Sequence, residues 1–160
     1  MAISRWRRNE ERSLLAALNM TERPPLNVTA GWESIFGETG RRRLETVELP
    51  EYLPKQRWFA GKSRKVKSVR IVDWIPLSVP LNVSSNASHS TLVLVQIEFD
   101  TGSPDLYFLP LAMRFGDAEN ELQRTAPKAI IARVVSQTRA GVLYDGAFDD
   151  RTCLLLFSLI

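Results

Sequence analysis

The sequence contains very few of the side chains that most often ligate metals or act as nucleophiles. Among its 160 residues there is one cysteine, Cys153, and one histidine, His89. A single cysteine excludes an intrachain disulfide, and with it the disulfide framework of small secreted proteins. We interpret His89, in a Ser/Asn-rich stretch with no second ligand nearby, as a loop residue, and Cys153 as a small apolar residue in an apolar run.

Several larger signals are also missing. The eight glycines are scattered, so neither a dinucleotide-binding loop nor a P-loop is present, and no kinase catalytic-loop signature occurs. No apolar run approaches the ~20 residues of a membrane-spanning helix. Glu10 and Glu11 and a short apolar stretch, 14–18, argue against a secretory signal, so we expect a cytoplasmic protein. Four Asn-x-Ser/Thr triplets are interpreted as chance occurrences: Asn19, Asn27, Asn82 and Asn86.

The first third of the chain favours short helices. We predict that residues 1–25 are either disordered or hold one short helix near 10–18, and that a turn-rich stretch over 26–40 and a helical pattern over 41–54 follow. Pro50 lies inside this last pattern, and a proline in a helix interior removes one hydrogen bond and clashes with the preceding turn. We therefore expect Pro50 to split the segment into two short helices.

The middle of the chain favours an antiparallel sheet. Residues 66–75 are predicted as a strand, and Val72 and Trp74 suggest that it is buried on both faces. Residues 91–99 alternate apolar and polar side chains, and 105–111 return as a third strand after the turn 100–104. This order of elements, with helices first and antiparallel strands after them, predicts an α+β fold in which short N-terminal helices pack on a curved antiparallel sheet.

The pattern changes near residue 112. We interpret 113–129 as a polar linker or surface loop, followed by short strands at 130–136 and 141–144 and a helix to the C-terminus. Asp145, Asp149 and Asp150 are expected at the helix N-terminus, where carboxylates are favourable; a metal site is the alternative. The chain stops within an apolar run, which we interpret as a sign that it is a piece of a longer protein.

One run of residues concentrates positive charge around two aromatic rings. Residues 55–70 hold seven basic residues and no acidic one, whereas the remainder has 14 basic and 18 acidic residues. Trp58 and Phe59 within the run are interpreted as buried anchors between helix and sheet. Two alternatives stay open: a nucleic-acid surface with aromatic stacking, and a surface that docks on an acidic face of another domain.

The stretch "LPEYLPKQRWFAGKSRKVKSVRIVDW", with the later "LYFLPL" and "GVLYDGAFDD", closely resembles the N-terminal region of bacterial maltokinases, including the maltokinase part of trehalose synthase–maltokinase fusions. In that family a Gln-Arg-Trp-Phe-x-x-Lys stretch closes the helical part of an N-terminal cap. It corresponds here to Gln56, Arg57, Trp58, Phe59 and Lys62.

The resemblance implies the function and the domain plan. It implies a cap at 26–111 and the truncated start of a second α/β subdomain, the intermediate kinase subdomain, at 112–160, after a lead at 1–25. The parent enzyme would phosphorylate maltose to maltose 1-phosphate with ATP and magnesium, for trehalose and α-glucan (glycogen) metabolism.

For this chain alone, the resemblance implies no catalytic, cofactor-binding or metal-binding residue. Gln56–Phe59 and Lys62 would anchor the cap core or contact another domain. The expected partners are the remaining kinase lobes and a fused or associated trehalose synthase, with no membrane. The alternative is a stand-alone regulatory or nucleic-acid-binding module that uses Lys55 to Arg70.

Overall fold

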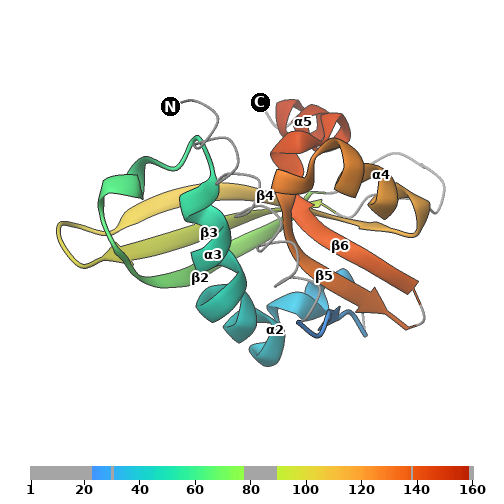
Figure 1. Ribbon diagram of the computed structural model, residues 1–160, viewed down its shortest axis with the longest axis horizontal. Helices are drawn as coiled ribbons and strands as arrows, with labels where there is room; N and C mark the ends of the chain where they lie inside the picture. Colours follow the sequence, from blue (N-terminus) through green and yellow to red (C-terminus); the bar gives the residue numbers. More distant parts are fainter. Residues whose placement is uncertain (1–22, 30, 78–89, 138, 159–160) are drawn as a thin grey trace, which may run out of the picture.

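The computed structural model describes residues 23–29, 31–77, 90–137 and 139–158, except the side chain of Trp32 (Figure 1). Its centre is a curled, six-stranded mixed sheet in the order β1-β5-β6-β4-β3-β2. The strands are β1 Leu26–Asn27, β2 Val66–Leu77, β3 Ser90–Phe99, β4 Asp105–Phe115, β5 Ile130–Ser136 and β6 Arg139–Asp145. The α+β class predicted from the sequence is confirmed. The expected helix near residues 10–18 lies outside the described residues, as do His89, Asn19, Asn82 and Asn86.

Strands β2, β3 and β4 form the antiparallel unit that the alternating pattern predicts. Val95 of β3 is paired with Ile71 of β2 on one side and Tyr107 of β4 on the other. Every second residue of β3, from Thr91 to Phe99, is buried, because successive side chains of a strand point to opposite faces of the sheet. The sheet therefore has a core face and an outer face.

The prediction that β2 is buried on both faces is wrong, and a β-bulge is the reason. The register shifts between Ile71 and Asp73, so that Trp74 pairs with Val93 on the core face. Trp74 stacks there on Phe36, with ring centroids 4.9 Å apart. Val72, in the bulge, is exposed. Because the bulge adds one residue to β2, the Trp74 side chain lies on the same face of the sheet as that of Ile71.

The predicted helical segment is continuous from residue 38 to residue 55. It consists of α2 Glu38–Arg43, a π-helical turn Leu44–Glu48, α3 Leu49–Tyr52 and a 3₁₀ turn Leu53–Lys55. The amide of Leu49 bonds to the carbonyl of Leu44, five residues earlier. Pro50 then lies in the first turn of α3, where its missing N–H is tolerated. The expected break at Pro50 is thus wrong; the wider turn accommodates the proline.

Two further differences concern β1 and the segment after β4. Leu26 pairs in parallel with Val134 of β5, so the sheet is mixed rather than antiparallel throughout. The predicted polar linker contains the end of β4 and the helix α4 Asp117–Thr125, in which only Leu122 is buried. One buried residue in nine explains why the apolar periodicity was too weak to predict this helix. Strand β4 also passes through residue 112, and the predicted division of the chain there stays a prediction.

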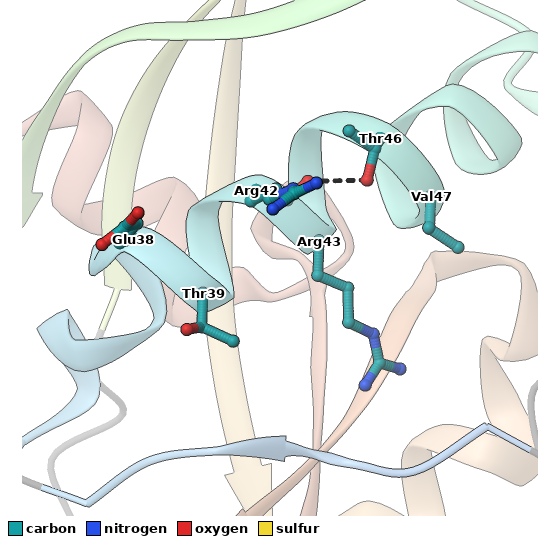
Figure 2. A pocket seen from close by; sticks show the side chains of 6 residues that line it. All are labelled: Glu38, Thr39, Arg42, Arg43, Thr46 and Val47. Carbon is teal, nitrogen blue, oxygen red and sulfur yellow. Dashed lines mark hydrogen bonds between the residues drawn. The ribbon is translucent and has the colours of Figure 1, made fainter.

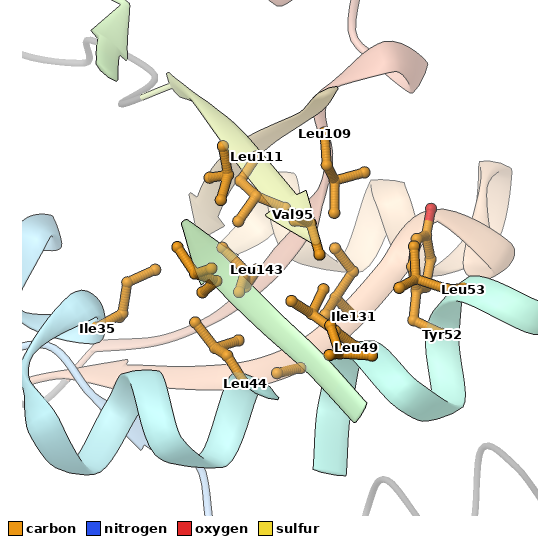
Figure 3. Packing of buried hydrophobic residues seen from close by; sticks show 14 of the residues in the cluster. Ile35, Leu44, Leu49, Tyr52, Leu53, Val95, Leu109, Leu111, Ile131 and Leu143 are labelled. Carbon is orange, nitrogen blue, oxygen red and sulfur yellow. The ribbon is translucent and has the colours of Figure 1, made fainter. Parts of the chain in front are cut away.

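The main core lies between the helical segment and the core face of the sheet. Figure 3 shows Leu44, Leu49 and Leu53 of the helical segment gathered with Leu109, Leu111 and Leu143 of the sheet. A second, smaller cluster lies on the outer face beneath α4; its members are Ala112, Leu122, Ala129, Ile130, Val142 and Tyr144. The C-terminal helix α5 Asp150–Phe157 lies beside α4 above the sheet (Figure 1).

Candidate functional site

The segment Gln56–Lys62 leaves the helical segment and turns toward β2, and Phe59 is its residue in the core. The Phe59 side chain is 2% exposed. Its ring centroid lies 5.3 Å from that of Tyr107 and 6.3 Å from that of Phe99. Phe59 therefore fixes the end of the helical segment against β3 and β4.

Trp58 is not a core residue, contrary to the sequence-based expectation. Its side chain is 41% exposed, and its ring makes a tilted contact with Tyr107 at 6.0 Å. Since Phe59 occupies the core position, the preceding residue is directed toward the surface. The Trp58 side chain nevertheless lies near the buried carboxylate of Asp145 and lowers the pKa of that carboxylate. Trp58 is thus a partly exposed ring beside a buried group.

The remaining residues of this segment have separate roles. The Gln56 side chain is buried, and its Nε2 donates to the carbonyl of Lys128 at 3.2 Å and, at 3.4 Å, to that of Tyr52. Arg57 and Lys62 are exposed, and the Lys62 Nζ donates to the Arg57 carbonyl at 3.4 Å. Gln56 therefore links the helical segment to the turn before β5, while Arg57 and Lys62 face outward.

Asp145, at the end of β6, joins the sheet to the helical segment. The Tyr52 hydroxyl donates to its Oδ2 at 2.7 Å, and the Ala147 amide donates to its Oδ1 at 2.9 Å. Burial raises the pKa of Asp145, although the hydrogen bonds from Ala147 and Tyr52 and the nearby Trp58 indole oppose the rise. Burial beside this carboxylate also raises the pKa of Tyr52. We call Tyr52, Gln56, Trp58, Tyr107 and Asp145 the Asp145 junction.

A second buried carboxylate, Asp149, organises the start of α5. Its Oδ2 accepts from the Tyr144 hydroxyl at 3.0 Å and from Thr152 at 3.2 Å, and its Oδ1 accepts from Arg114 at 3.1 Å. Arg114 Nε also donates to the Tyr144 hydroxyl, at 3.1 Å. Burial, with the charge of Asp149, raises the pKa of Tyr144 to about 12, so this hydroxyl remains a donor to the carboxylate. The Thr152 hydroxyl lies 2.9 Å from that of Ser90 in β3.

These two carboxylates were predicted as helix N-terminal residues, and the geometry agrees. Asp149 accepts from the Arg151 amide at 3.4 Å, and Asp145 caps a 3₁₀ turn through Ala147. Their second partners, Tyr52 and Arg114, were not predicted, because nothing in the local sequence connects them. Both carboxylates are at most 4% exposed, so this arrangement holds elements together and does not present a carboxylate to a substrate.

The basic run divides into one structural residue and an exposed set. Arg64 is ion-paired with Asp105, donates to the Ser103 carbonyl, and lies over the Phe99 ring at 3.7 Å. The remaining six basic residues of the run are exposed, and no carboxylate of the described residues is within ion-pair distance of them. They are Lys55, Arg57, Lys62, Lys65, Lys67 and Arg70.

A hollow of about 390 Å³ lies beside α2 and the π-helical turn (Figure 2). Thr39, Arg42 and Thr46 line it, and Arg43 extends from the helix toward β1. Arg43 is already engaged with Glu48 and with the carbonyl of Pro24. None of the five site residues predicted from the sequence lines this hollow. Among the described residues there is also no group of three or more His, Cys, Asp or Glu side chains that could hold a metal ion.

A comparison with protein families gives a match that spans both carboxylates. A family model described as the maltokinase N-terminal cap domain matches residues 52–149, which is more than half of the chain. The match begins at Tyr52 and ends at Asp149, so it contains the whole Asp145 junction. No helix of the described residues has the length and apolar character needed to span a membrane.

Proposed function

The chain belongs to the family of maltokinase N-terminal cap domains, and we propose that it acts as the cap of a maltokinase-like enzyme without catalysing the reaction itself. The role that we infer is to provide a rigid body on which the catalytic part of the kinase is positioned. Fold alone does not specify a reaction, so this proposal depends on the residues of the Asp145 junction.

The observation that carries the proposal is that three separated stretches meet at the Asp145 junction. Tyr52 comes from the end of the helical segment and Trp58 from the stretch that follows it, Tyr107 from β4, and Asp145 from β6. The Tyr52 and Asp145 side chains are buried and 93 positions apart in the sequence. Such a contact fixes the helical segment relative to the sheet, which is what a positioning domain requires.

For the parent enzyme we propose the reaction that the family implies, the ATP-dependent phosphorylation of maltose to maltose 1-phosphate in trehalose and glycogen metabolism. ATP and magnesium would bind residues outside this chain. The proposed partners are the remaining kinase lobes and a fused or associated trehalose synthase. We place the protein in the cytoplasm, which its single cysteine favours.

A second candidate function is supported by the exposed basic residues. Six exposed cations from Lys55 to Arg70, none within ion-pair distance of a carboxylate of the described residues, lie next to the partly exposed Trp58 and would suit the phosphates and bases of a nucleic acid. Arg64 is excluded from this surface, because it is engaged with Asp105. Charge reversal should therefore be made at Lys62, Lys65 and Lys67.

Two measurements test the proposed function. In the first, the chain is incubated with maltose, ATP and magnesium. In the second, the chain is titrated onto the catalytic part of a maltokinase prepared without its own cap. We expect no maltose 1-phosphate from the chain alone, and association with the catalytic part. Turnover by the chain alone would contradict the proposal.

Binding to single-stranded DNA tests the second candidate. Salt-dependent binding that disappears on charge reversal at Lys62, Lys65 and Lys67 would favour the nucleic-acid function instead. The matched control is charge reversal at three exposed cations of other elements, Arg42, Arg124 and Lys128. Loss of binding in both variants would indicate nonspecific attraction by net charge.

A further inference from the structure

Strand β2 forms one border of the sheet (Figure 1). It pairs with β3, and in the described part of the chain no strand pairs with its other edge. An unpaired edge presents backbone N–H and C=O groups that can bond to a strand of another chain, and this is a common route to self-association. The partners of these edge groups therefore decide whether β2 is open to a second copy of the protein.

Two side chains of the helical segment bond to the backbone of Ile71 at this edge. The Ile71 amide donates to Oε1 of Glu45 at 2.8 Å, and the Ile71 carbonyl accepts from Nη2 of Arg41. The two side chains are also ion-paired with each other, with Arg41 Nε 3.0 Å from Glu45 Oε1. One donor and one acceptor thus meet the same residue from outside the sheet, as the backbone of a further strand would.

Two further positions of the same edge lack a donor that a partner strand could use. Trp74 and Pro76 each pair with a β3 residue an even number of positions from the partner of Ile71, so both face the free edge. The Trp74 amide donates to Oδ1 of Asp73 at 2.8 Å. Pro76 has no N–H, and proline within a sheet is confined to edge positions of this kind. The edge donors at Ile71, Trp74 and Pro76 are therefore already used or absent.

Arg70 adds a charge at the place where two copies would pair. Val69, two residues before Ile71, presents its N–H and C=O to the same edge. A twofold pairing of two β2 strands that uses both Val69 and Ile71 is centred on Arg70. Arg70 is exposed, and it would lie directly opposite Arg70 of the second copy, with Cα atoms about 4.5 Å apart. Like charges in such a pair are destabilising.

We propose that the Arg41–Glu45 pair occupies the edge of β2 in place of a further strand and, with Arg70, keeps β2 from pairing with β2 of a second copy. Attachment of the helical segment to the sheet does not require this pair, because Leu44 and Leu49 already pack in the main core. The inference gives Arg70, in the basic run, a role that needs no ligand. It is independent of the proposed function, so either can fail without the other.

The test measures self-association of the 18.1 kDa chain by sedimentation velocity over a range of concentrations, with amide hydrogen exchange to locate the contact. The variant Arg41→Ala/Glu45→Ala frees both backbone groups of Ile71. A milder variant, Arg41→Ala/Arg70→Ser, frees only the carbonyl and removes the charge opposite the second copy; it keeps Glu45 as the acceptor for the amide. The matched control, Glu119→Ala/Gln123→Ala, removes a hydrogen-bonded pair of the same spacing from α4.

We expect Arg41→Ala/Glu45→Ala to associate at a concentration about 10-fold lower than the unaltered chain, since one backbone donor and one acceptor become available. The amides of Val69 and Ile71 should exchange more slowly in the associated form. The milder variant should change in the same direction and carries the test if circular dichroism shows that the first variant is unfolded. The control should behave like the unaltered chain.

Three results would overturn the proposal. In the first, both variants stay as monomeric as the unaltered chain while their melting temperature falls, which would leave the pair with only a role in attaching the helical segment. In the second, the variants associate but the Val69 amide exchanges as fast as in the monomer, which would place the contact elsewhere. In the third, the control associates as readily as the variants.

Discussion

Trp58 and Phe59 provide the sharpest test of how the helical segment is attached to the sheet. They are adjacent in sequence and both aromatic, yet Phe59 is 2% exposed and Trp58 is 41% exposed. Phe59 contacts two rings of the core, whereas Trp58 contacts one ring and lies near Asp145. Truncating each to alanine should therefore affect stability unequally.

The magnitudes follow from what each side chain would leave behind. Phe59→Ala leaves a cavity in the main core and should lower the free energy of unfolding by about 3–5 kcal/mol. Trp58→Ala loses the covered part of its ring, which amounts to about 2 kcal/mol. Trp58→Phe keeps most of the ring contact and should cost less than about 1 kcal/mol.

Urea unfolding followed by far-ultraviolet circular dichroism measures these differences without depending on tryptophan fluorescence. An unchanged denaturant slope in all three variants would show that the same surface is exposed on unfolding. The expected order of destabilisation is Phe59→Ala, then Trp58→Ala, then Trp58→Phe. A Trp58→Ala variant as unstable as Phe59→Ala would refute the reasoning, because it would mean that the indole is a core residue.

Three further predictions concern single contacts. Burial raises the pKa of Asp145, so the folded state binds a proton more readily than the unfolded chain, and this residue's contribution to stability falls as pH rises from 3.8 through the folded pKa. Asp145→Asn should remove that fall from the pH profile of urea midpoints; an unchanged profile would contradict the pKa direction. Gly61→Ala places a Cβ 2.5 Å from the Phe99 ring and should destabilise by about 1–3 kcal/mol; an unchanged melting temperature would exclude that close approach. Arg64→Ala loses contacts to Asp105 and Phe99 at a cost of about 1 kcal/mol, and Arg64→Lys should not restore them; full rescue by lysine would show that only the charge matters.

The sheet was predictable where the signal is local. The alternation from Thr91 to Phe99 has a period of two, and the structure buries that face of β3. The turn after Phe99 contains Gly102, which adopts a positive φ of 82° that favours glycine. Residues 130–136 form a strand with the bounds that the sequence indicates. In each case the pattern and the turn residues agree on one structure.

The irregular features were not predictable, because each one breaks the period on which the prediction depends. The bulge at Val72 inserts one residue, and so Trp74 appears on the wrong face when the strand is read as regular. The π-helical turn widens the helix by one residue, which leaves the amide of Leu49 bonded to the carbonyl of Leu44. Pro50 marked the right place, but the sequence did not indicate whether the helix would break or widen there.

Two residues of the Asp145 junction were identified from the sequence, but the contacts that connect them were not. Asp145 was identified by its position before a helix, and Trp58 by its place in a basic run. Their connection needs β6 to lie beside β4 and the helical segment to cross the core face, so it is a property of the whole fold. A carboxylate buried at this point needs donors, and Tyr52 and Ala147 supply them from two separate stretches. Replacing the Tyr52 donor would leave Asp145 less satisfied, which ties the helical segment and the turn before α5 to a single buried carboxylate.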